Sequence, residues 1–287
     1  MMNRDRRQAA HGDAGGSTGG PYHAASSGNS QGASPSAPGH PSILPLFPHA
    51  ARLRCGISTR HGGVSAPPFD SLNLGAATRD RPQAVAENRR RFAAAAGIEL
   101  ERAVRMRQVH GARVVTVETP GRVGDADGLV TRRCDLPLLV TVADCMPVFF
   151  HDPETGLIAA VHAGWRGVVA GVLEAAVDAL AGLGGPPRRL QVVIGPAIGP
   201  CCFEVGHEVA AAFDRRDHRP GRRGRPHVDL GAAARRRLAA LGVPAAAVQG
   251  PTLCTRCHSD RFFSSRAGEP TGRMSGFLVQ RPPTPAP

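Results

Sequence analysis

Two apolar runs separated by a short polar turn place the strongest constraint on how this chain can fold. Residues 147–151 and 157–161 alternate too little between apolar and polar side chains to face water, which is typical of buried strands. The five residues between them are Asp, Pro, Glu, Thr and Gly, which favour a tight reversal of the chain. The sequence therefore predicts an antiparallel hairpin over residues 147–161.

This hairpin would bring two ligand-type side chains together. Cys145 lies just before the first strand and His162 just after the second, at the two ends of an antiparallel pair. A thiolate and imidazoles are ligands for zinc or copper, and three protein ligands leave a fourth position for water or substrate. A third candidate is His110, in the segment Gln-Val-His-Gly, but no spacing in the sequence places it beside the other two.

The rest of the chain alternates between strand-like and helix-like segments. Further strands are predicted over residues 114–117, 138–142 and 190–194. Residues 195–206 contain two Pro and three Gly, so they cannot form regular structure for long. We expect a rigid loop there, at the rim of the site.

Three helices are predicted from their apolar stripes and end signals. The first is capped by Asp80 and stops at Gly97. The second follows His162, with an apolar stripe over residues 169–180. The third is capped by Asp229 and ends at Gly242.

The two ends of the chain differ from its centre. Residues 1–41 are rich in Gly, Ser, Pro and Ala and are predicted to be a disordered tail, and residues 281–287 a loose end. Residues 42–280 should form one domain. The odd count of seven Cys and the lack of a secretion signal favour a cytoplasmic protein with reduced thiols, and no apolar run approaches the roughly 18 residues of a membrane span.

The formal net charge of +12 raises the question of a nucleic-acid partner. The basic residues are all Arg, without a single Lys, while Ala, Gly and Pro are abundant, as a GC-rich coding sequence would produce. No nucleic acid is therefore expected as a partner. An Arg-rich module that binds polyanions remains the non-enzyme alternative.

A series of short motifs runs in order from residue 44 to residue 279. They are Ser58-Thr59-Arg60-His61-Gly62-Gly63-Val64-Ser65, Ser71-Leu72-Asn73-Leu74, Asn88-Arg89, Gln108-Val109-His110-Gly111, Asp125-Ala126-Asp127-Gly128, Ala143-Asp144-Cys145, His162-Ala163-Gly164-Trp165-Arg166-Gly167, residues 194–206 and Thr271-Gly272-Arg273. Together they resemble the laccase-domain family, also called multicopper polyphenol oxidase-like. That family includes purine nucleoside phosphorylases and the peptidoglycan editing factor.

The resemblance implies a fold, a metal and a reaction. The fold would be α+β, a single domain of mixed β-sheets flanked by helices, with residues 42–280 as the catalytic domain. The metal ligands would be His110, Cys145 and His162, holding zinc, with copper as the alternative. The reaction would be phosphorolysis of adenosine, inosine or 5′-methylthioadenosine to free base and ribose 1-phosphate, with adenosine deamination as a second activity.

Other residues are candidates for roles around this centre. Arg60, Arg166 and Arg266 have the planar geometry that binds a phosphate co-substrate, although each could instead form a salt bridge within the fold. Asn73, from a matching motif, is a further candidate substrate contact. Asp144 or Glu204 is the candidate proton shuttle for deamination.

Two positions depart from the family pattern and leave substrate preference open. Arg256 stands where the family commonly has an aromatic residue, and Ser265 where a Tyr or His is usual. Cys254 and Cys257, with Cys201 and Cys202, could form a structural zinc site. Their spacing does not match the usual paired motif, which favours small buried apolar side chains beside the cleft.

Two alternative enzymes use the same residues. In an amide hydrolase that edits peptidoglycan precursors, Cys145 would attack covalently with His162 as its base. A copper-dependent polyphenol oxidase would need several His-rich copper centres, whereas three ligands serve one ion.

Overall fold

The computed structural model describes residues 39–47, 52–221 and 224–282, and the predicted hairpin lies at the centre of this region. Strands β8, Met146–His151, and β9, Ile158–Ala163, pair in antiparallel fashion with Met146 opposite Ala163. Asp152 forms the turn, because its carboxylate accepts hydrogen bonds from the Glu154 amide and the Thr155 hydroxyl. The predicted hairpin is therefore confirmed.

Two six-stranded mixed sheets form the body of the domain. The other strands are β1 Ile43–Leu46, β2 Leu53–Ser58, β3 Val104–Arg107, β4 Val114–Thr116, β5 Gly121–Asp125, β6 Gly128–Thr131, β7 Leu138–Val142, β10 Gln191–Ile194, β13 Val248–Gln249 and β14 Met274–Gln280. One sheet has the order β1-β2-β14-β7-β3-β5 and the other β13-β10-β8-β9-β6-β4. The strands predicted at residues 114–117, 138–142 and 190–194 are confirmed to within one residue at each end.

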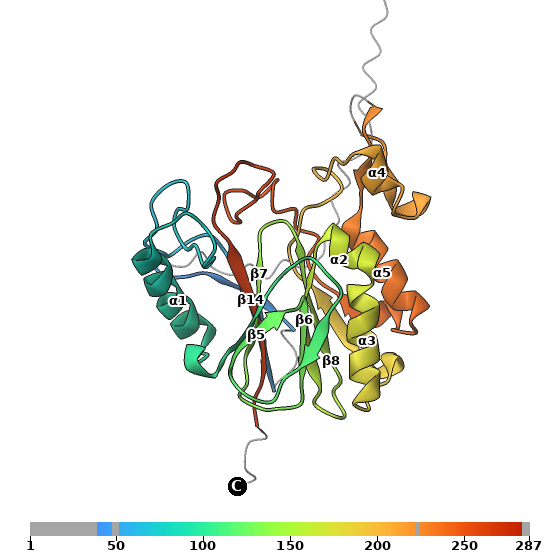
Figure 1. Cartoon of the computed structure of the whole chain (residues 1–287), viewed down its shortest axis with the longest axis horizontal. Coiled ribbons are helices and arrows are strands. Elements are labelled where there is room, and N and C mark those ends of the chain that lie inside the picture. The colour runs from blue at the N-terminus through green and yellow to red at the C-terminus, as the bar shows by residue number, and fades with distance from the viewer. Residues whose placement is uncertain (1–38, 48–51, 222–223, 283–287) are drawn as a thin grey trace, which may run out of the picture. The chain divides into compact units, whose positions relative to one another are not determined.

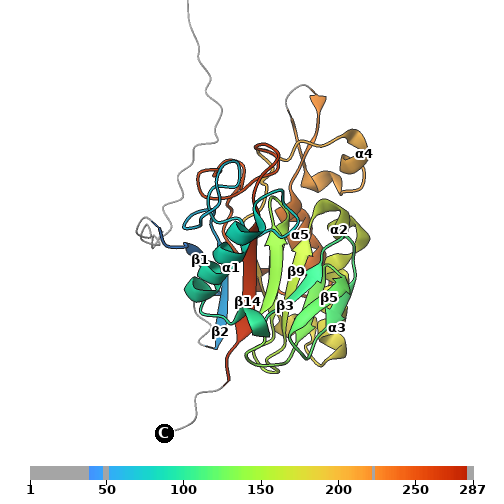
Figure 2. The same cartoon turned by 60° about the vertical axis from the view of Figure 1, so that its left-hand side comes forward.

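Helices cover the outer faces of the two sheets. They are α1 Pro82–Ala96, α2 Trp165–Ala170, α3 Val172–Gly182, α4 His207–Ala210 and α5 Leu230–Ala240, with short 3-10 turns η1 Leu100–Arg102, η2 Pro187–Arg189, η3 Arg215–Asp217 and η5 Ala245–Ala247. Helix α1 lies against the first sheet, while α2, α3 and α5 lie on the other side, next to the second sheet (Figure 1). In Figure 2, α1 lies in front of β2 and β14. A small ribbon of β11 His218–Arg219 and β12 His227–Val228 follows α4.

The apolar core lies between these layers. Phe149 and Ile158 of the second sheet pack against Val140 and Met274 of the first, and all four are buried. Burial of a large apolar side chain contributes roughly 1.5–3 kcal/mol. Strands β8 and β9 of the second sheet are therefore buried on both faces. The weak alternation between apolar and polar residues in these strands predicts this burial.

The start of the first helix differs from the prediction. Asp80 does not cap α1, which begins after Arg81. Instead, the Asp80 carboxylate accepts hydrogen bonds from the Ser65 hydroxyl at 2.6 Å and the Asn73 amide at 2.9 Å. The predicted end is confirmed, since Gly97 adopts a left-handed conformation with φ 60°.

The second predicted helix is two helices. Gly171, with φ 92°, ends α2 and begins α3, so the chain changes direction within the predicted stripe. Val169 is exposed as a result, and its inclusion in the buried stripe is wrong. The cap of the third helix is confirmed, because Asp229 accepts a hydrogen bond from the Ala232 amide at 2.9 Å.

The predicted tails fall mainly outside the described residues. Residues 1–38 and 283–287 are not described, and residues 39–41 form a turn and a bend that lead into β1. The described residues from 39 to 282 all fall in one compact unit. Within the described part, no helix combines the length and the apolar character needed to cross a membrane.

Candidate metal centre

Three ligand-type side chains converge at one end of the two sheets. Donor atoms of His110, Cys145 and His162 all lie within 4.8 Å of one another. Cys145 directly precedes β8, His162 lies near the end of β9, and His110 lies in the loop between β3 and β4. The structure thus brings together all three residues, including the one that spacing alone did not place.

A buried carboxylate organises this group. Asp127, which precedes β6, accepts hydrogen bonds from the backbone amides of Val109 at 3.2 Å, His110 at 3.0 Å and Gly111 at 2.7 Å. It also contacts Nδ1 of His162 at 2.8 Å. This contact leaves Nε2 of His162 available as a donor atom, because the second ring nitrogen is held by the carboxylate.

Asp127 was not among the predicted site residues, although it lies in a matching motif. The same holds for Gln108, whose side-chain amide donates to the Thr141 carbonyl at 2.7 Å and accepts from the Thr141 amide at 2.8 Å. These bonds attach the His110 loop to β7. His110 itself has φ 60°, a strained value for a side chain of this type, which the surrounding hydrogen bonds stabilise.

The electrostatics favour a thiolate at the centre. Burial would raise the pKa of the Cys145 thiol, but hydrogen bonds from His110 and His162 and the charges of these rings lower it to about 6. Burial would lower the pKa of His162, but Asp127 and Cys145 raise it to about 9. The thiolate is the form that binds metals and also the form that attacks electrophiles.

Glycine leaves room for the three side chains. A Cβ atom at Gly164 would lie 2.9 Å from Sγ of Cys145 and 3.0 Å from Cδ2 of His110. The backbone there has φ −75° and ψ 167°, which any residue adopts. Glycine is therefore required at this position because a side chain would collide with Cys145 and His110, and not because of the backbone conformation.

Asp144 lies beside the centre with both oxygens occupied. Oδ1 accepts from the Thr255 hydroxyl at 2.6 Å and Oδ2 from the Arg266 amide at 2.9 Å. The Glu204 carboxylate lies 3.7 Å from Arg225 and 3.8 Å from His227. Of the two candidate shuttles, Asp144 is thus tied to neighbouring loops, and Glu204 is the less constrained.

Two of the predicted substrate and phosphate contacts, Arg60 and Asn73, form hydrogen bonds within the fold. Arg60 donates to the Asp70 side chain and carbonyl and to the Ser259 carbonyl at 2.8–3.1 Å. Asn73 is fully buried. Its side-chain nitrogen donates to the Asp80 carboxylate, and its side-chain oxygen accepts from the backbone amide of Arg273. These contacts support a structural role for both residues.

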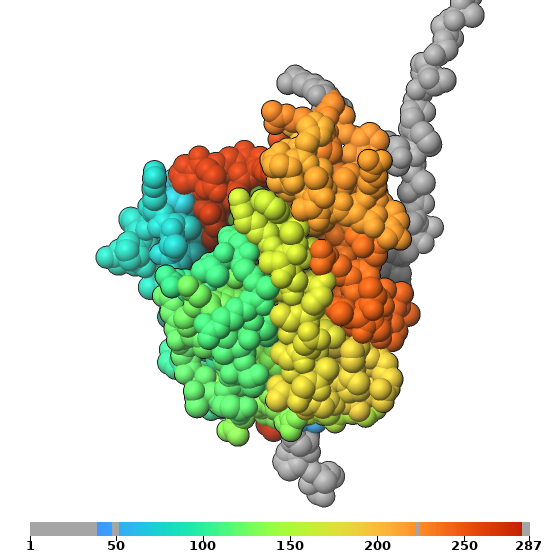
Figure 3. Space-filling model, turned by 45° about the vertical axis from the view of Figure 1, so that its right-hand side comes forward, coloured from blue at the N-terminus to red at the C-terminus, as the bar shows by residue number. Residues whose placement is uncertain are grey.

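The other two arginines are exposed. Arg166 stacks on Trp165 at 4.4 Å and forms no ion pair with residues that the structure describes. Arg266 stacks on Phe203 at 5.2 Å and donates to the Glu204 carbonyl at 2.7 Å. Figure 3 shows the segment around α4, in orange, and the red loop that precedes β14 on either side of the yellow-green segment that contains α2.

Four cysteines form a second cluster. Donor atoms of Cys201, Cys202, Cys254 and Cys257 also lie within 4.8 Å of one another. Only Cys254 is buried, whereas Cys201 and Cys257 are exposed. The interpretation of these residues as small buried apolar side chains is therefore wrong for Cys201 and Cys257, while Cys202 is partly buried and packs against the apolar core.

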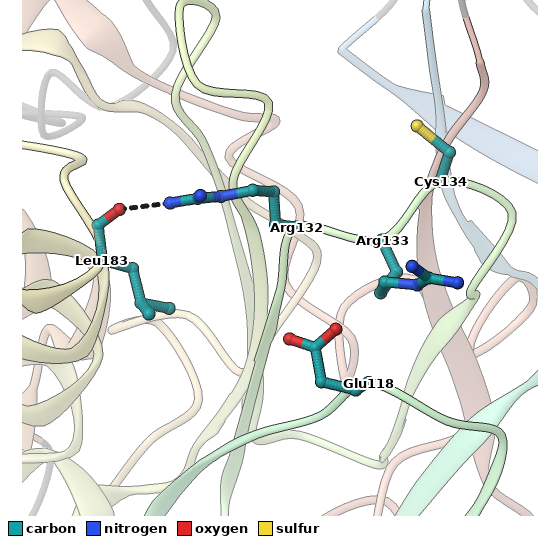
Figure 4. A pocket seen from close by; sticks show the side chains of 5 residues that line it. All are labelled: Glu118, Arg132, Arg133, Cys134 and Leu183. Carbon is teal, nitrogen blue, oxygen red and sulfur yellow. Dashed lines mark hydrogen bonds between the residues drawn. The ribbon is translucent and has the colours of Figure 1, made fainter.

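A surface hollow elsewhere shares no residue with either cluster. Its lining is Glu118, Arg132, Arg133, Cys134 and Leu183, and Arg132 donates to the Leu183 carbonyl (Figure 4). This hollow contributes nothing to the metal centre.

Comparison with known proteins identifies the family. A family model described as multi-copper polyphenol oxidoreductase laccase matches residues 54–281. The chain belongs to this family. The predicted resemblance to the laccase-domain family is thus confirmed.

Relatives and solved structures agree with this assignment. A Pseudomonas aeruginosa protein named purine nucleoside phosphorylase is 44% identical over 245 residues, covering 82% of this chain and 97% of its own. Escherichia coli YfiH, with the same enzyme name, is 40% identical over 242 residues, again covering 82% of this chain and 97% of its own. The structure of YfiH from Bacillus licheniformis superposes with a TM-score of 0.79 at 32% identity and covers 84% of this chain and 97% of that one. The predicted α+β fold of mixed sheets with flanking helices is confirmed.

Proposed function

We propose that this laccase-domain protein is a metal-dependent purine nucleoside phosphorylase. The names of its relatives support the reaction. The convergence of His110, Cys145 and His162 is the observation that carries the metal dependence. Adenosine, inosine and 5′-methylthioadenosine are the proposed nucleosides, with adenosine deamination as a second activity.

The donor set fits zinc, and copper is the alternative. One thiolate and two imidazoles form a three-ligand site, with His162 oriented by the Asp127 carboxylate. When bound, such an ion supplies Lewis acidity and the activation of water near neutral pH. Asp127 holds two of the ligands in place through its hydrogen bonds to the His110 loop and the His162 ring.

The arginines supply the second requirement, a phosphate held in position. In phosphorolysis, a phosphate oxygen bonds to the anomeric carbon of ribose, the glycosidic C–N bond breaks, and its electron pair leaves with the base, which takes up a proton. Arg166 and Arg266 have exposed guanidinium groups that can orient the phosphate. Glu204 is the proposed proton carrier, and Asp144 the residue that positions the loops.

The experiment is elemental analysis of the purified protein, followed by chromatography of adenosine incubated with and without phosphate. Adenine that forms only with phosphate supports phosphorolysis, and inosine that forms without phosphate supports deamination. His110→Ala, Cys145→Ala and His162→Ala should each abolish base release. His207→Ala and Cys134→Ala, outside the centre, are matched controls, and near-normal turnover by any of the three ligand variants rejects the shared-metal model.

One observation favours a second candidate, an amide hydrolase. The donor atoms of Cys145 and His162 lie within 4.8 Å of one another, and although burial would raise the pKa of the Cys145 thiol, the hydrogen bonds and charges of the two histidine rings lower it, which favours a thiolate beside a protonated imidazole. The thiolate would attack the amide carbon, His162 would protonate the departing amine, and water would then hydrolyse the thioester. Rapid alkylation of Cys145 that zinc does not suppress, with no base release from nucleosides, would support this reaction.

Two further alternatives have less support. A polyphenol oxidase would use several copper centres, whereas the centre formed by the described residues contains two histidines and one cysteine. For a polyanion-binding module, the Arg runs would need free cations, but Arg90 and Arg91 both contact Glu87, and Arg237 contacts Glu174. We propose a cytoplasmic location, since none of the seven cysteines, all of which the structure describes, forms a disulfide.

A further inference from the structure

We propose that Cys201, Cys202, Cys254 and Cys257 form a second, structural zinc site that joins two loops at the rim of the metal centre. Four thiolates with no open position are a ligand set of structural zinc sites. The site is separate from the His110, Cys145 and His162 centre, with which it shares no ligand.

The sulfur positions suit a tetrahedron around one ion. Sγ of Cys257 lies 3.4 Å from Sγ of both Cys201 and Cys202. The donor atoms of all four residues lie within 4.8 Å. Zinc–sulfur bonds of about 2.3 Å require sulfur separations of roughly 3.8 Å, which falls inside this range.

The backbone around Cys254 also has the form of a thiolate-binding turn. Cys254 begins the turn Cys254-Thr255-Arg256-Cys257, and the amides of Cys257 and Arg256 donate toward its sulfur. The amide of Gly199 does the same from the other loop. Backbone donors of this kind stabilise and orient metal-bound ligands.

Glycine again permits the close approach. A Cβ atom at Gly199 would lie 3.1 Å from Cβ of Cys254 and 3.3 Å from Sγ of Cys201. The side chain of Arg256, between the two cysteines, is exposed. Arg256 is therefore not packed among the four sulfurs.

The cluster lies where two loops already pair. Ala197 donates to the Leu253 carbonyl at 3.2 Å and accepts from the Thr255 amide at 3.0 Å. Thr255 in turn donates to the carboxylate of Asp144, the neighbour of Cys145. An ion held by the four cysteines would therefore stabilise the segment that carries Asp144 and Cys145 without itself belonging to the first metal centre.

The test measures metal content in a chain whose first centre has been removed. Cys145→Ser lacks the thiolate of that centre, so any tightly bound zinc should belong to the second site. We expect about one zinc per chain in this variant, with an all-sulfur shell at about 2.3 Å by X-ray absorption. Adding Cys257→Ser should reduce the zinc to none, whereas adding Cys134→Ser, a cysteine outside the cluster, should leave it unchanged.

Several results would overturn the proposal. They are zinc retained in the Cys145→Ser/Cys257→Ser chain, a shell that contains nitrogen, and zinc-free protein with disulfides among the four cysteines after purification with zinc and reductant. If Cys257→Ser prevents folding, Cys201→Ser at the second exposed position replaces it. Because metal content is the readout, the result is independent of whether the first centre performs phosphorolysis.

Discussion

Replacement of Gly164 by alanine tests whether the metal centre depends on the space beside Cys145. The new Cβ atom would lie 2.9 Å from Sγ of Cys145. Comfortable contacts begin at roughly 3.5 Å, so the sulfur must retreat by about 0.6 Å. Metal–ligand distances vary by only about 0.2 Å, so the displacement is about three times what a bound ion allows.

The expected effect is large on the metal and small on the fold. Alanine is compatible with the backbone at this position and lowers the entropy of the unfolded chain, which stabilises by about 0.4–1 kcal/mol, while crowding costs about 1–3 kcal/mol. The unfolding free energy should therefore change by no more than about 2–3 kcal/mol. Zinc affinity should fall by at least about tenfold, or roughly 1.4 kcal/mol.

Competition with a chromophoric chelator, in chains that carry Cys257→Ser so that only the first centre binds zinc, measures the affinity, and urea unfolding of the metal-free protein measures the stability. The control is Gly182→Ala at the end of α3, where an added Cβ meets nothing within 4 Å. Unchanged zinc affinity in Gly164→Ala, with Cys145 still a ligand, would refute the steric argument.

Three other perturbations have definite expected outcomes. Asp127→Asn, which turns amide hydrogens toward backbone donors, should weaken metal binding by about 10- to 100-fold in the same competition assay. Asp229→Ala removes the cap of α5 and should cost about 1 kcal/mol in urea unfolding, whereas no loss would contradict the capping role. Asp152 is buried and, although burial would raise its pKa, Arg189 at 2.6 Å and Thr155 lower it. It therefore stabilises the fold above its unfolded pKa of about 3.9, and the stability difference between wild type and Asp152→Asn should shrink as the pH falls through the lower folded value.

Local patterns predicted the centre of the fold well. The hairpin depends on two neighbouring runs and the turn between them, and its two strands follow from these alone, whereas the register comes from the structure. The break at Gly171 was missed because apolar residues continue on both sides of it, although the backbone adopts a left-handed conformation there.

Long-range features of the site were harder to predict. Two contacts place His110 beside the other ligands. The backbone amide of His110 donates to Asp127, and the side chain of Gln108 donates to the Thr141 carbonyl. The cysteine cluster depends on pairing between Ala197 and Leu253, which no spacing rule describes. In both cases the determining contacts join segments that are distant in the chain.

The single carboxylate of Asp127 has a consequence for how the centre can change over time. It holds the backbone of the His110 loop and the ring of His162, so a shift in one ligand is transmitted to the other. Substitutions at the two histidines should therefore be non-additive, with a coupling that disappears when Asp127 is replaced. Evolution cannot tune the two ligands one at a time, and the three residues should change together or not at all.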